Sequence, residues 1–97
     1  MSPSPTEYIL ALGRSFPCLE PKIRDWKPLR FDADSFHDMT RGWSTSERHA
    51  VSFILTIWNP GYAREKRWTF DAVEAVSSLD PVNRAPILQW MKHPYYP

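Results

Sequence analysis

The sequence predicts an all-α fold: a compact bundle of about four short helices, with an irregular proline-rich segment packed across it. Two observations favour this class. Side chains that cap helices precede apolar segments, most clearly in the run Ser-Thr-Ser-Glu that begins at Ser44. In addition, 14% of the 97 residues are aromatic, and each buried ring removes roughly 150–250 Å² from water. A few large rings can therefore give a small helical domain an adequate core.

The length of the chain suits one domain. We expect residues 1–5, which read Met-Ser-Pro-Ser-Pro, to form a flexible N-terminus and residues 6–97 to form a single helical domain. The 12 basic and 11 acidic side chains nearly balance, which argues against bulk nucleic acid or an anionic membrane surface as the partner. The longest apolar run, residues 50–58, is too short to span a membrane, and the first residues lack a signal-peptide pattern. We therefore expect no membrane partner. Because Cys18 has no second cysteine to pair with, we also expect a cytoplasmic protein.

The N-terminal third is expected to begin with a short helix and then to become irregular. Thr6 is a candidate N-cap, and a helix that follows it would turn Tyr8 and Ile9 to one side. Residues 16–31 contain three prolines and show no clean apolar period. They predict an extended segment that crosses the core, with a short strand possible at residues 29–31.

Two helices in the middle of the chain have clearer start signals. Asp32 is placed to cap a helix over residues 33–39. Ser44 and Glu47 fit a capping box, which predicts a helix over residues 45–58. Since that segment is apolar on most of its circumference, it should be the central buried helix.

A rival interpretation of the same segment remains open. Residues 51–58 are rich in β-branched and aromatic side chains and are also compatible with a buried strand. That possibility defines the alternative fold class, α+β with a short strand or hairpin around residues 29–31 and 51–58. The capping signal favours the helix.

The segment after residue 58 is expected to break and then to resume as helix. Residues 59–61, Asn-Pro-Gly, predict a break, and residues 62–67 read as a polar connector. A helix over residues 70–79 would bury an apolar stripe of Val73, Val76 and Leu79, helped by Ala72 and Ala75.

The last helix is complicated by a proline. Asp80 and Pro81 predict a helix start, but Pro86 would lie inside the helix, where proline removes a hydrogen bond and clashes with the preceding turn. Either residues 81–85 form a single turn and the helix begins at Pro86, or one helix is kinked there. Of the two, we expect a final helix over roughly residues 86–92. Residues 94–97 should form an extended tail. The side chains expected to pack inward are Ile87, Leu88, Trp90 and Met91.

The residue types that carry chemistry do not form a catalytic or metal-binding motif. Cys18 is flanked by apolar residues and stands in no motif with a histidine, so it is interpreted as a small core residue. Asp34, His37 and Asp38 would share one helix face, but their spacing is not specific for a metal site, and the favoured interpretation is a solvated polar face with capping roles. We therefore expect a protein that is not an enzyme and has no metal or cofactor.

The C-terminus carries the features that favour protein recognition. His93, Tyr95 and Tyr96 lie in a proline-flanked tail, and tyrosine is enriched in protein interfaces. They are the candidate partner-binding residues, unless the tyrosines fold back onto the core of their own chain. The sequence thus predicts a non-enzymatic protein-interaction module, or a small accessory or regulatory protein, whose partner is an unidentified protein or a second copy of the chain.

Nucleic-acid binding is the alternative function. One short segment combines positive charge with an adjacent aromatic ring, as proteins that grip phosphates and stack bases do. Its residues are Arg64, Lys66, Arg67 and Trp68.

Overall fold

The computed structural model describes residues 4–97 and confirms the all-α class. Within those residues there are seven helices and no strand, so the number of helices exceeds the expected four and the α+β alternative is wrong. The helices are α1 (Pro5–Arg14), α2 (Glu20–Ile23), α3 (Ala33–Met39), α4 (Thr45–Trp58), α5 (Pro60–Glu65), α6 (Ala72–Ser78) and α7 (Pro81–Lys92).

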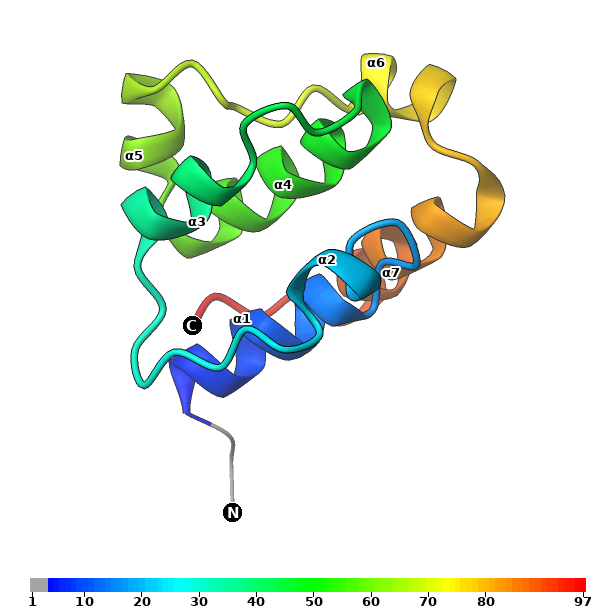
Figure 1. Cartoon of the computed structure of the whole chain (residues 1–97). Helices are drawn as coiled ribbons and strands as arrows, with labels where there is room; N and C mark the ends of the chain where they lie inside the picture. The colour runs from blue at the N-terminus through cyan, green and yellow to red at the C-terminus, as the bar shows by residue number, and fades with distance from the viewer. Residues whose placement is uncertain (1–3) are drawn as a thin grey trace.

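The helices form two layers (Figure 1). Helices α3, α4, α5 and α6 make up one layer, and α1, α2 and α7 lie across from it. The hydrophobic core fills the space between the layers and is built around α4, which contacts α1, α3, α5 and α6. The largest fully buried side chains are Phe16, Phe36, Ile9, Leu19, Ile23, Ile54, Leu55 and Val51.

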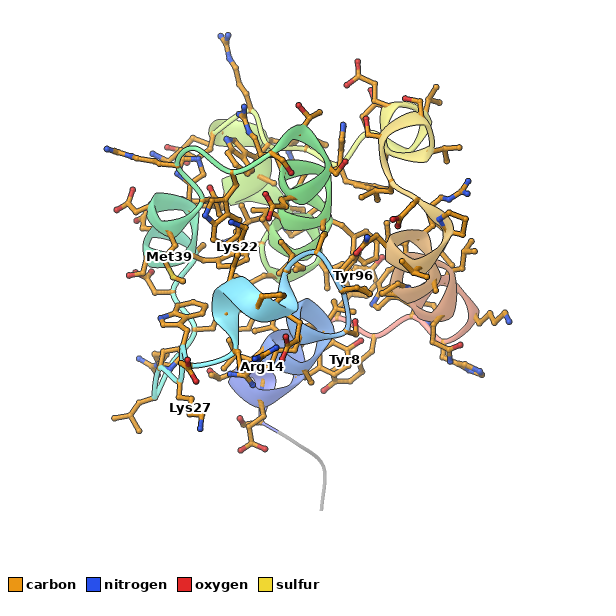
Figure 2. All side chains as sticks on the ribbon, turned by 45° about the vertical axis from the view of Figure 1, so that its right-hand side comes forward. Tyr8, Arg14, Lys22, Lys27, Met39 and Tyr96 are labelled. Atoms are coloured by element: carbon orange, nitrogen blue, oxygen red, sulfur yellow. The ribbon has the colours of Figure 1, made fainter. Side chains whose placement is uncertain are left out.

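Helix α4 begins with the expected capping box. The Glu47 amide donates to Ser44 Oγ at 3.2 Å, and the Ser44 amide donates to Glu47 Oε1 at 2.8 Å. Two otherwise unpaired amides are satisfied in this way. Figure 2 shows Lys22 extending from α2 toward this helix start, where its Nζ lies 3.4 Å from Glu47 Oε2. These local contacts explain why a segment of β-forming residues is helical over its whole length.

Helix α1 starts earlier than the sequence suggested. Its N-cap is Ser4, whose Oγ accepts from the Glu7 amide at 3.1 Å, and Pro5 occupies the first turn, where its missing N–H costs nothing. Pro5 therefore lies in the helix and Ser4 caps it, while residues 1–3 lie outside the described residues. The prediction of Thr6 as the cap is wrong, because Thr6 Oγ1 instead accepts from the Phe31 amide at 3.0 Å.

The segment between residues 16 and 31 is less extended than expected. It contains the short helix α2, and Phe16, Leu19 and Ile23 are buried against the core. The possible strand at residues 29–31 is absent from this described segment, and Leu29 is fully exposed. The expectation for α3 is confirmed, with Asp32 Oδ2 accepting from the Ser35 amide.

The polar connector expected over residues 62–67 is largely a helix. Asn59 ends α4 and also caps α5, since its Oδ1 accepts from the Tyr62 amide at 3.0 Å. Pro60 then stands at the first helical position, which proline tolerates. The predicted break is therefore a sharp junction between two helices.

Helix α6 buries a different face from the one that the sequence predicts. Asp71 caps it by accepting from the amides of Val73 and Glu74. The buried residues are Ala75 and Leu79, whereas Val73 and Val76 are exposed. The prediction that both valines pack inward is wrong, because the small Ala75 side chain is the part of α6 that is buried in the core beside α4.

Helix α7 runs without interruption through Pro86, so the expectation that the final helix begins there is wrong. The carbonyl that loses its donor belongs to Val82, an exposed residue, where solvent can replace the missing amide. Ile87 is buried as expected, but Leu88 and Met91 are exposed. The prediction of which α7 side chains pack inward is therefore only partly correct.

Candidate functional site

An apolar groove lies between α6 and α7. It encloses about 230 Å³, and its walls are apolar apart from one arginine. The side chains that matter most for its shape and charge are Ala72, Val76, Arg84, Ile87, Leu88 and Met91. We call this feature the α6–α7 groove.

The rim of the groove exposes three large apolar side chains. Val76 is 58% exposed, Leu88 57% and Met91 53%. Val73, on α6 but outside the groove lining, is also exposed. Each is a side chain whose full burial is worth about 1.5–3 kcal/mol. Contiguous apolar patches of this kind mark interaction sites in soluble proteins.

Arg84 is the one charged residue in the groove lining. Its side chain is partly buried. Among the described residues it takes part in none of the three salt bridges and in no side-chain hydrogen bond. An unpaired guanidinium beside an apolar surface favours a ligand that brings a carboxylate.

The C-terminal tail folds back onto the chain. The ring of Tyr95 lies 4.6 Å from that of Tyr8 on α1, between centroids, and Figure 2 shows Tyr8 next to the tail. Trp90 Nε1 donates to the Tyr95 carbonyl at 3.0 Å, and the Tyr96 ring lies 5.3 Å from that of Trp90. Tyr95 remains 48% and Tyr96 68% exposed, and His93 is exposed as well. The tail thus packs on its own chain while leaving apolar surface accessible.

The side chains of the basic segment at residues 64–68 have different surroundings. Lys66 Nζ lies 5.9 Å from the centre of the Tyr62 ring, and Arg64 is exposed in the last turn of α5. Arg67 has a positive φ of 59°, which turns the chain between Lys66 and Trp68. Arg67 and Trp68 line one pocket together with residues of α4 and α6.

Trp68 instead belongs to a second group of residues that the sequence did not bring together. The Arg48 guanidinium carbon lies 5.0 Å from the centre of its ring, and the His37 ring meets it edge-on at 4.7 Å. Arg41 and Trp43 line the same pocket. These residues come from α3, α4 and two loops, so no local motif in the sequence could have identified them.

The polar residues of α3 do not converge on a metal. Asp34 Oδ1 accepts from the Tyr62 hydroxyl at 2.9 Å, whereas His37 packs against Trp68. Burial and the Asp34 hydrogen bond together raise the pKa of Tyr62 to about 12. Within residues 4–97, no three histidine, cysteine or acidic side chains are placed to hold a metal ion.

Cys18 is held in a structural setting. Its amide donates to Asn83 Oδ1 at 2.8 Å, and burial, together with the charge of Glu47, raises the pKa of its thiol to about 11. The thiol is therefore protonated at neutral pH, which makes it a poor nucleophile.

Among the described helices, none is long and apolar enough to cross a membrane.

Comparison with known proteins finds no protein-family model, no curated protein and no solved structure that matches the chain.

Proposed function

We propose that this protein is a non-enzymatic interaction module that binds a partner protein in the α6–α7 groove. The observation that carries the proposal is the exposure of Val76, Leu88 and Met91 around a groove whose walls are otherwise apolar. Burying these side chains against a partner removes their surface from water, which is the dominant favourable term in most protein association. The protonated Cys18 thiol supports a binding role over a catalytic one. A lone, unpaired cysteine also suits action in the reducing cytoplasm.

The occupant is an amphipathic helix that carries an acidic side chain beside its apolar stripe. A groove between two helices accepts the apolar face of a third, whose anchors recur every three or four residues. The charge of Arg84 selects among such helices, because a partner without a carboxylate would cover a guanidinium and leave it unpaired. The C-terminal tyrosines, which pack beside α1 and Trp90, are a separate surface outside the groove.

The test is a selection of displayed helical peptides against the folded protein and against Leu88→Asp. The aspartate places a charge in the apolar groove, so we expect peptides selected on the unaltered protein to lose binding at least a hundredfold. Val82→Asp is the matched control, since Val82 lies on the same helix and is 59% exposed but does not line the groove. Binding to that variant should remain within about threefold.

The circular dichroism spectrum shows whether both variants keep their helices. Failure to select any peptide that distinguishes Leu88→Asp from the unaltered protein would contradict the proposal. A concentration-dependent dimer that Leu88→Asp dissociates, seen by light scattering, would assign the groove to a second copy of the chain instead of a partner helix.

A further inference from the structure

A second pocket, independent of the groove, combines positive charge with indole rings. It encloses about 390 Å³, which lies within the range of small-molecule sites. The residues that give it its chemistry are His37, Thr40, Arg41, Trp43, Arg48 and Trp68. We call it the arginine–tryptophan pocket.

The charge in this pocket is positive. Arg41 and Arg48 both line it, and no acidic residue is among the described residues that do. Arg41 has one acidic neighbour, Asp38, but the two approach only to 4.0 Å and both side chains are largely exposed, so the pair is weak. Both guanidinium groups are therefore available to an anion, and arginine recognises phosphate through paired N–H donors.

The aromatic part of the pocket places two indole rings beside the arginines. The Arg48 guanidinium carbon lies 5.0 Å from the centre of the Trp68 ring, a cation–π distance that puts a positive charge next to an aromatic surface. The Trp43 ring contributes a second aromatic surface. His37 also lines the pocket, and its ring meets the Trp68 ring edge-on at 4.7 Å between centroids.

We propose that the arginine–tryptophan pocket binds one nucleotide unit, with its phosphate between Arg41 and Arg48 and its base beside Trp43 and Trp68. The unit belongs either to a free nucleotide or to a single-stranded nucleic acid. On the other side of Arg48 and Trp68, the neighbouring pocket carries charges of both signs, because Arg67 lines it together with Asp71 and Glu74.

The test is calorimetric titration with adenosine monophosphate, with inorganic phosphate and with ten-residue oligothymidylate. The indole N–H resonances of Trp43 and Trp68 are followed by NMR in parallel. We expect adenosine monophosphate to shift both resonances and to bind at least tenfold more tightly than phosphate, because stacking adds to the charge contact. Arg41→Gln and Arg48→Gln should each weaken binding by about 10–100-fold, the loss typical of one charge-assisted hydrogen bond. Arg64→Gln is the matched control, since it removes the same charge outside the pocket.

The outcomes separate the two sources of the nucleotide. Tighter binding of the oligonucleotide would assign the pocket to a nucleic-acid strand, and equal or weaker binding would assign it to a free nucleotide. The proposal is overturned if neither adenosine monophosphate nor the oligonucleotide shifts the two indole resonances. It is also overturned if phosphate binds as tightly as the nucleotide, or if Arg64→Gln weakens binding as much as the two pocket variants.

Discussion

Asn83 shows how one buried polar side chain joins distant parts of this small chain. Its Oδ1 accepts from the Cys18 amide, 65 residues away in sequence, and its Nδ2 donates to Asp80 Oδ1 at 2.8 Å. Asp80 also caps α7 by accepting from the Asn83 amide at 3.0 Å. A buried amide that lost this partner would cost about 1–3 kcal/mol. The start of α7 is therefore tied to the turn that follows α1.

The thiol at this junction should be nearly inert in the folded protein. Because the pKa of Cys18 rises from its ordinary value of 9.0 to about 11, the thiolate fraction at neutral pH falls about a hundredfold. We expect iodoacetamide at pH 7.5 to alkylate the native protein at least fiftyfold more slowly than the urea-unfolded chain, as measured by mass spectrometry. Similar rates in the two states would contradict the buried environment of this residue.

At the scale of the element, Pro86 is the clearest departure from local preference. Proline in a helix interior is about 3 kcal/mol less favourable than alanine, yet α7 continues through it. Since the helix is already formed there, Pro86→Ala restores a donor for the Val82 carbonyl. The gain is reduced by about 0.4–1 kcal/mol because alanine leaves the unfolded chain more freedom.

We therefore expect Pro86→Ala to stabilise the protein by about 1–2 kcal/mol, raising Tm by roughly 4–8 °C per kcal/mol for a domain of this size. Differential scanning calorimetry measures the change. Ala85→Gly, at the exposed neighbouring position, is the control and should lower stability by about 1 kcal/mol if this part of α7 is helical. An unchanged or lower Tm for Pro86→Ala would show that the proline ring contributes more by packing than it costs the helix.

The helices that the sequence predicts well are those whose start is fixed by neighbouring residues. Asp32 and Ser44 cap amides three residues away, so the sequence contains the whole interaction. Helix α5 was missed because Asn59 serves two helices at once, and an Asn-Pro-Gly run reads as a break. Whether a helix continues after such a run depends on the packing of Ala63, which is buried.

The candidate site could not be predicted in the same way. Val73 and Val76 follow a helical period and read as core, but which face of a short helix is buried depends on its neighbours. In the structure Ala75 is buried in the core beside α4 and the valines are left exposed. The apolar residues that the sequence assigned wrongly to the core are thus among those that now form the proposed docking surface.

At the scale of the whole molecule, the two layers place the core around α4 and leave α7 at one side (Figure 1). One face of α7 lines a shallow pocket together with α1, and this pocket includes Tyr8 and Trp90. Another face of α7 forms one wall of the α6–α7 groove. A helix placed in this way has apolar residues on both faces, which explains why α7 shows no single apolar stripe in the sequence.

The central claim is that the α6–α7 groove binds an acidic amphipathic helix, and it requires that binding depend on the charge of Arg84. A peptide selected on the groove is compared with the same peptide carrying lysine in place of its acidic residue, against the unaltered protein and against Arg84→Glu. If the carboxylate meets Arg84, the unaltered protein should prefer the acidic peptide by about 10–100-fold, the worth of one charge-assisted hydrogen bond.

The deciding measurement is the dissociation constant of all four combinations, determined by fluorescence anisotropy. The account predicts that Arg84→Glu reverses the preference, so that the lysine peptide binds more tightly. The same preference for the acidic peptide in both proteins would contradict it, because the groove would then not be selecting its occupant through Arg84.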